Sequence, residues 1–198
     1  MIRDDISNKL IHMTKGETKD AAAKSFLSIL QEGRLRGGTS MIKGGHQCVC
    51  FTEAPVSKLA TILSDPSILG VRYAPFGIMV DKAWLFRQGG RPVIYQSDEE
   101  YEVLPDPIRY RHVRYEPENG VDFTWEREWR INTAELILEP SETTVVVPTR
   151  NWEDYFMNKH IEKLQRDVRI LGGVAVMHMV KCQWHFIVLE DLGINIQW

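Results

Sequence analysis

The apolar segments of this 198-residue chain are short, and Gly, Pro and charged residues interrupt them from end to end. Runs of about 4–8 such residues between turn signals predict β-strands rather than helices. The predicted strands are residues 9–14, 47–52, 77–80, 92–96, 109–115, 135–138, 143–147, 174–179 and 184–189. They outnumber the predicted helices. The chain shows no long alternation of strand and helix, which argues against a doubly wound parallel sheet. The sequence therefore predicts a single α+β domain over residues 1–198.

Helices and loops are predicted between these strands. The predicted helices are residues 21–32, 57–63, 81–86 and 151–166. In the first helix, Ala22, Phe26 and Leu30 recur at helical spacing, and Gly33 is a C-terminal stop. The glycine-rich segment 34–45 and the segment 70–76 are predicted to be loops. The acidic segment 97–107, which prolines interrupt, is predicted to lie at the surface.

Charge and hydropathy limit the classes of partner. The net charge is −3 and the chain has no long basic run, which argues against a dedicated nucleic-acid surface. No segment approaches the ~20 apolar residues that span a bilayer. The first residues, Met1 to Asp5, lack the basic and then apolar form of a signal peptide. We therefore expect a cytoplasmic protein with no membrane partner.

The three cysteines do not predict a disulfide framework. Cys48 and Cys50 are two residues apart, Cys182 is distant, and their number is odd. His46 precedes the first pair, but His-x-Cys-x-Cys is not a common zinc spacing and no second pair lies nearby. Small buried thiols on a strand are the favoured interpretation, and no metal site is predicted.

The segment Phe123–Ile131 carries two carboxylates two residues apart. As a strand it would place Glu126 and Glu128 on one face, beside Arg130, with two tryptophans on the other face. Paired carboxylates near a guanidinium suit general-base catalysis or the stabilisation of a developing cation. The alternative is a solvated strand face whose glutamates pair with arginines.

The order of short motifs along the chain suggests a family. His12-x-Thr14 ends the first strand, a helix follows that Gly33 closes, and later elements are Cys48–Glu53, Ser57-Lys58 and Glu128-Trp129. This order resembles the ADP-ribosyltransferase fold of the His–Tyr–Glu class, over roughly the first two-thirds of the chain. The resemblance implies a split β-sandwich of short strands with a few helices, and NAD as substrate.

The resemblance also implies roles for single residues. His12 and Thr14 would hold NAD, and Glu128 would be the catalytic carboxylate. Glu126 completes a Glu-x-Glu pattern, as in the arginine-modifying branch, and would orient the acceptor. The expected stacking tyrosine falls on Cys50, so that either Phe51 or Tyr73 replaces it or nicotinamide binds differently.

Arg72, next to Tyr73, is a further candidate for NAD binding. His12 and Phe51 also have a structural alternative, as a core histidine bonded to the backbone and as a core aromatic residue.

A second resemblance comes from three segments. The Cys-Phe-Thr-Glu element at 50–53, the Tyr-Ala-Pro-Phe-Gly-Ile segment at 73–78 and the Trp-Glu-Arg-Glu-Trp-Arg element at 125–130 look like a bacterial family related to abortive-infection proteins. This likeness implies a toxin or phage-defence role, with an antitoxin as a possible partner.

Three functions are consistent with the sequence. The first is an NAD-consuming ADP-ribosyltransferase or NAD glycohydrolase, whose acceptor is a protein, a nucleic acid, a small molecule or water. The second is a non-catalytic relative that binds a nucleotide or a protein. The third is a metal-dependent nuclease in which Glu126 and Glu128 hold Mg²⁺.

Overall fold

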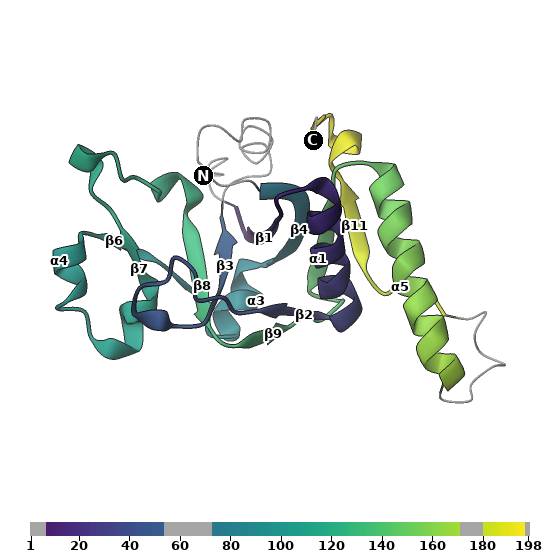
Figure 1. Cartoon of the computed structure of the whole chain (residues 1–198), viewed down its shortest axis with the longest axis horizontal. Helices are drawn as coiled ribbons and strands as arrows, with labels where there is room; N and C mark the ends of the chain where they lie inside the picture. Colours follow the sequence, from purple (N-terminus) through teal and green to yellow (C-terminus); the bar gives the residue numbers. More distant parts are fainter. Residues whose placement is uncertain (1–6, 54–72, 171–179, 197–198) are drawn as a thin grey trace. The chain divides into compact units, whose positions relative to one another are not determined.

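Strands and helices alternate irregularly along the chain, and the fold is α+β (Figure 1). The computed structural model describes residues 7–53, 73–170 and 180–196. The helix predicted at 57–63, the strand predicted at 174–179 and Arg72 lie outside the described residues. Two compact units divide the chain: unit 1 comprises residues 1–12, 34–59 and 79–138, and unit 2 comprises residues 13–33, 60–78 and 139–198.

The main sheet of unit 1 has the strand order β1–β3–β8–β5. Its strands are β1 (Lys9–Lys15, to His12 in this unit), β3 (Cys48–Thr52), β8 (Glu128–Asn132) and β5 (Arg91–Pro92). Neighbouring strands are antiparallel, with Ile11 opposite Thr52 and Thr52 opposite Glu128. Val49 and Phe51 of β3 are buried, as expected for the apolar central strand of a sheet.

Two smaller sheets and short helices complete unit 1. β2 (Arg34–Arg36) pairs antiparallel with β9 (Glu135–Ile137), and β6 (Ile94–Gln96) pairs parallel with β7 (His112–Arg114). The α-helices are α3 (Lys82–Arg87) and α4 (Asp98–Tyr101). The 3₁₀ helices are η1 (Lys43–Gly45), η2 (Asp106–Arg111), η3 (Pro117–Asn119) and η4 (Thr124–Glu126).

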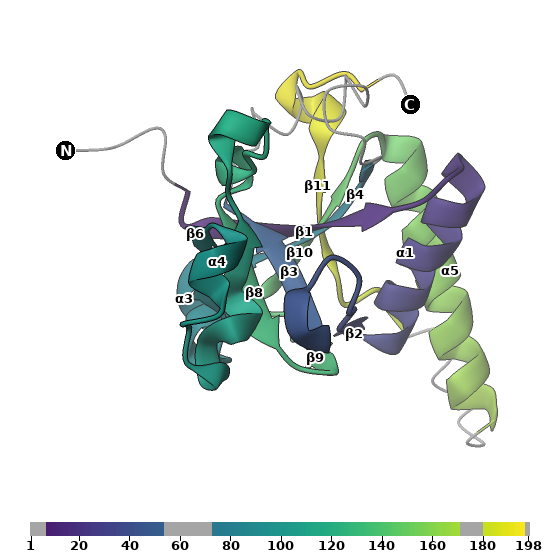
Figure 2. The ribbon, with the colours of Figure 1, turned by 60° about the vertical axis from the view of Figure 1, so that its left-hand side comes forward.

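Unit 2 contains β-strands in the order β11–β10–β4–β1 and two α-helices. Its elements are β1 from Met13, α1 (Lys19–Glu32), β4 (Tyr73–Asp81, to Ile78 in this unit), β10 (Thr143–Val147), α5 (Arg150–Ile170), β11 (His185–Val188) and η6 (Leu189–Leu192). Figure 2 shows α1 beside α5. Gly33 ends α1 in the left-handed conformation, with φ 66°, which confirms the predicted stop.

An aromatic cluster fills the interior of unit 2. The rings of Phe26, Phe76 and Phe156 are mutually in contact, with centroids 5.1 to 5.5 Å apart. These side chains come from α1, β4 and α5, so that the cluster ties both helices to the sheet. Burial of three phenylalanines removes a large apolar area from water and is the main stabilising contribution expected here.

Several predicted elements are wrong or incomplete. The segment 34–45 contains β2, where Leu35 is buried, and 70–76 contains the start of β4, where Ala74 and Phe76 are buried. The strand predicted at 109–115 is confirmed only over β7, because residues 109–111 belong to the 3₁₀ helix η2. The surface segment 97–107 contains α4. Burial against neighbouring elements outweighs the local turn signals of Gly and Pro in these segments.

The main correction concerns Phe123–Ile131, which is not one strand. Thr124 donates from its backbone N–H and its hydroxyl to the carboxylate of Asp122, at 2.9 and 2.6 Å. This local turn competes with strand pairing and opens the 3₁₀ helix η4. Arg127 then adopts a left-handed conformation, with φ 44°, and β8 begins at Glu128.

Candidate functional site

Glu128 is the first residue of β8, and the turn before it separates it from Glu126. The hydroxyl of Thr52 donates to the backbone carbonyl of Glu126, and the backbone N–H of Glu128 donates to the Tyr95 hydroxyl at 3.1 Å. Because Glu126 lies in η4, the expectation that both carboxylates share one face of a strand is wrong. Only Glu128 is placed by the pairing of β8 with β3.

The carboxylate of Glu128 forms a two-point ion pair with Arg130. Nε of Arg130 lies 2.8 Å from Oε1 and its Nη2 lies 3.1 Å from Oε2. The exposed fractions of the two side chains are 11% for Glu128 and 5% for Arg130. Burial acts to lower the pKa of Arg130, but the hydrogen bond and charge of Glu128 outweigh it and raise that pKa. The guanidinium of Arg130 therefore keeps its charge.

Cys50 lies on the same face as this ion pair, opposite Arg130 in the β3–β8 register. Burial is the main cause that raises the pKa of its thiol, and the charge of Glu128 raises it further. Hydrogen bonding with Glu128 is a smaller cause of the same rise in the pKa. Burial likewise raises the pKa of Cys48 to about 11. Both thiols are free, as is that of Cys182, and neither strand thiol is activated as a nucleophile.

His12 lies on the neighbouring strand β1, but its side chain belongs to the other face. Its Nδ1 is 2.8 Å from the carbonyl oxygen of Cys50 and must carry the proton, since a carbonyl only accepts. The pairing of Ile11 with Thr52 sets His12 opposite Phe51, and their rings meet edge to face at 5.8 Å. Phe51 is opposite Trp129.

Directly opposed residues of antiparallel strands share a face. Three neighbouring strands thus carry His12, Phe51 and Trp129 on one face of the unit 1 sheet. Cys50, Glu128 and Arg130 lie on the other face. The strands of the three predicted motifs are brought together, whereas the imidazole and the carboxylate are not.

Two further candidates belong to unit 2. Thr14 is buried in β1, and its hydroxyl has no hydrogen-bond partner in the part of the chain that the structure describes. Tyr73 begins β4, and the ammonium group of Lys15 lies 5.2 Å from the centre of its ring. The structure thus describes Thr14 and Tyr73 within the same unit.

Sequence reasoning missed the partners of these residues. On the Trp129 face, Oε1 of Glu53 pairs with Nζ of Lys82 at 2.5 Å, and Oε2 of Glu53 accepts from the indole of Trp129 at 3.1 Å. Arg130 also donates through Nη1 to the backbone carbonyls of Tyr110 at 3.0 Å and His112 at 2.8 Å. Backbone carbonyls carry no sequence signal, so only the fold could reveal them.

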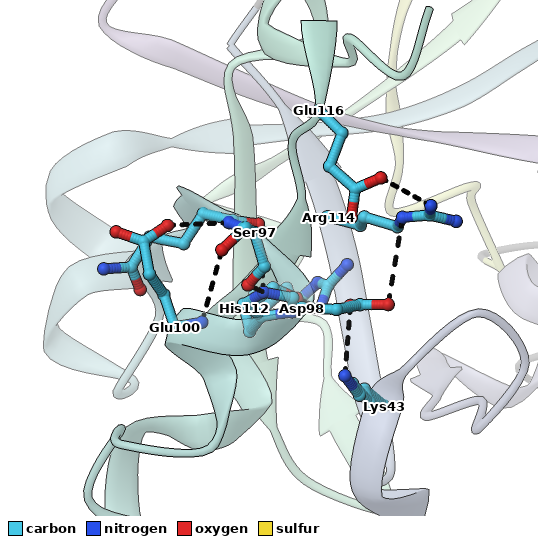
Figure 3. Close-up of polar contacts among 9 residues, drawn as sticks. Lys43, Ser97, Asp98, Glu100, His112, Arg114 and Glu116 are labelled. Atoms are coloured by element: carbon cyan, nitrogen blue, oxygen red, sulfur yellow. Dashed lines mark hydrogen bonds and ion pairs between the residues drawn. The ribbon is translucent and has the colours of Figure 1, made fainter. Parts of the chain in front are cut away.

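Figure 3 shows a network of polar contacts around β7, the strand that begins with His112. Asp98 pairs with Nζ of Lys43 at 3.0 Å, and Arg114 lies between Asp98 and Glu116, 2.6 Å from the latter. The hydrogen bond from Arg114 is the main cause that lowers the pKa of Glu116 to about 2. These charges balance, which indicates a structural role in unit 1.

In residues 7–53, 73–170 and 180–196, no three His, Cys, Asp or Glu side chains gather as a metal site requires. Within the same ranges, no helix combines the length and apolar character that a membrane crossing requires.

Comparisons of the chain with protein-family models, with curated proteins and with solved structures each found no match.

Proposed function

We propose that the chain consumes NAD, as an ADP-ribosyltransferase or an NAD glycohydrolase, with Glu128 as the catalytic carboxylate. One observation supports this proposal above the others. The His-x-Thr, aromatic and glutamate motifs lie on β1, β3 and β8, which are neighbours in one sheet although they are far apart in the sequence. This adjacency of strands is what the resemblance implies, although the His12 and Glu128 side chains lie on opposite faces.

The environment of Glu128 suits the reaction. The bond between nicotinamide and ribose breaks with oxocarbenium character, and an ionised carboxylate fixed near the ribose stabilises that charge. A carboxylate offers about four lone-pair sites. Arg130 occupies two of them, so that a ribose hydroxyl can use another. Nicotinamide leaves with the bonding electrons, and the acceptor attacks the ribose carbon.

The two faces of the sheet divide the predicted roles. Because His12 and Glu128 lie on opposite faces, we assign bond cleavage to Glu128 alone. The assignment of His12, Thr14, Phe51, Tyr73 and Arg72 to NAD binding stays what the resemblance implies.

The test is incubation of the purified chain with NAD. The expected result is release of free nicotinamide, or transfer of label from NAD to a macromolecule in a cell extract. An absence of both, with protein, nucleic-acid and small-molecule fractions each offered as acceptor, would contradict the proposal. Growth arrest on expression would extend it to the toxin or phage-defence role that the second resemblance implies.

A second candidate is a non-catalytic relative that binds a nucleotide or a protein. The two-point pairing of Glu128 with Arg130 favours it, because a carboxylate committed to an ion pair has a structural use of its own. Calorimetry with NAD, together with the nicotinamide assay, separates the two candidates. The non-catalytic relative would bind NAD without releasing nicotinamide. The nuclease hypothesis is weaker, because the Arg130 guanidinium contacts both Glu128 oxygens that a cation would need.

A further inference from the structure

Arg130 is buried beside Glu128, and its side chain donates four hydrogen bonds. Its guanidinium donates to both carboxylate oxygens of Glu128 on one side. On the other side, Nη1 donates to the carbonyls of Tyr110 and His112. A surface arginine would spend these donors on water, whereas here four protein contacts fix the plane of the guanidinium.

The carbonyls that hold Arg130 are themselves fixed. The His112 ring contacts the carbonyls of Gln96 and Ser97 through Nε2, at 3.1 and 3.0 Å (Figure 3). Val113, the next residue, pairs with Tyr95 across β6 and β7. The hydroxyl of Tyr95 in turn accepts the backbone N–H of Glu128.

A closed chain of contacts therefore returns to Glu128. Its backbone is held by Tyr95 and its carboxylate by Arg130, and both partners depend on the β6–β7 pair. A two-point guanidinium contact sets the orientation of a carboxylate as well as its distance, which one ammonium cannot do.

We propose that Arg130 is the positioning residue of Glu128, and that β6, β7 and the carbonyls of Tyr110 and His112 form the frame that aims this carboxylate at the ribose of NAD. This inference rests on the proposed function. It predicts that activity depends on the shape of the Arg130 head group as well as on its charge. A role in stability alone predicts no such dependence once the variant is folded.

The test compares Arg130→Lys with Arg34→Lys. Both variants keep the positive charge and lose the planar fork, but Arg34 pairs with Glu135 at the exposed surface of the same unit. For each variant, kcat and KM for nicotinamide release are measured at a temperature well below its thermal unfolding midpoint. We expect a fall in kcat of ~100-fold for Arg130→Lys with KM within about threefold, since a misplacement near 1 Å costs about this much. Arg34→Lys should match the wild type.

Three outcomes would contradict the inference. An unchanged kcat in folded Arg130→Lys would make Arg130 a structural residue and leave the proposed function intact. A raised KM with unchanged kcat would make it a binding residue instead of a positioning residue. A wild-type chain that releases no nicotinamide would overturn the proposed function and this inference together.

A second variant keeps the test decisive if Arg130→Lys does not fold. Tyr95→Phe removes the hydroxyl that accepts the Glu128 N–H and changes no charge. The inference predicts a smaller fall in kcat, on the order of tenfold, with little change in KM. Wild-type kcat in folded Tyr95→Phe would contradict the proposed frame.

Discussion

Unit 1 and unit 2 treat a buried ionisable side chain in opposite ways. In unit 1, Arg130 makes two contacts to Glu128 and two to backbone carbonyls. In unit 2, His160 is 2% exposed, and among the described residues neither of its ring nitrogens has a hydrogen-bond partner. The two units therefore differ in the interactions that surround a buried ionisable side chain. Directional polar contacts fix the geometry of the buried charge in unit 1, whereas apolar and aromatic packing surrounds the buried imidazole in unit 2.

The surroundings of His160 support this contrast. Its ring meets the ring of Trp184 edge to face at 5.9 Å, and the Trp184 indole donates to the carbonyl of Leu30 in α1. One turn along α5, Lys163 carries a positive charge. None of these three groups is an anion that would stabilise an imidazolium. Burial is the main cause that lowers the pKa of His160, and Lys163 lowers it further.

The largest effect on stability is expected in the aromatic interior of unit 2. Phe156 contacts Phe26, Phe76 and Trp152, so that Phe156→Ala would leave a cavity among rigid rings. We expect a loss of roughly 4 kcal/mol in the free energy of unfolding, measured with denaturant. Phe156→Leu is the control and should cost much less. Equal losses for both variants would show that ring packing does not hold this unit.

A slightly smaller effect is expected from breaking the buried ion pair of unit 1. Arg130→Met leaves the Glu128 carboxylate without its counter-charge and should cost roughly 3 kcal/mol. The double variant Glu128→Gln with Arg130→Met should recover much of that loss, because the uncompensated charge is gone. A double variant whose loss equals the sum of the single losses would mean that the two side chains do not interact.

The smallest effect is a pH dependence carried by His160. Its folded pKa lies below its unfolded pKa of about 6.5, so the unfolded chain binds the proton first. Stability contributed by the neutral ring is complete above pH ~6.5 and falls as pH drops, by at most ~1.4 kcal/mol per unit, until the folded pKa is reached.

His160→Phe should flatten this dependence. Free energies of unfolding measured from pH 7.5 to 5 for both proteins give the comparison. A slope that persists unchanged in the variant would assign the acid sensitivity to other groups.

The sequence predicted those elements whose local pattern agrees with their burial. α1, with its apolar spacing and Gly33, and the apolar strands β3 and β10 are examples. β4 was partly missed, because Pro75 and Gly77 are turn signals that its burial overrides. Glu128 was singled out correctly as a strand residue, but the prediction that Glu126 shares its strand face was wrong, since Asp122 redirects the chain just before it.

The partners of Arg130 lay beyond sequence reasoning for a different reason. Two of its four contacts go to main-chain carbonyls of Tyr110 and His112, which any residue could supply. Only the arrangement of β7 and β8 in unit 1 identifies them.

The central claim is that Glu128 is the carboxylate of an NAD-consuming site, and one set of rates tests it most directly. Nicotinamide release at saturating NAD is measured for the wild type, Glu128→Gln, Glu126→Gln and Glu135→Gln, with thermal unfolding as the check on folding. Glu135 is an exposed glutamate of the same unit, paired with Arg34, and serves as the control.

We predict a loss of ~10²–10³-fold in the release rate for folded Glu128→Gln and a rate near wild type for Glu135→Gln. Glu126→Gln should lower transfer to an acceptor more than it lowers hydrolysis. A folded Glu128→Gln that releases nicotinamide at the wild-type rate, or a greater loss in Glu126→Gln, would contradict the assignment of the catalytic carboxylate.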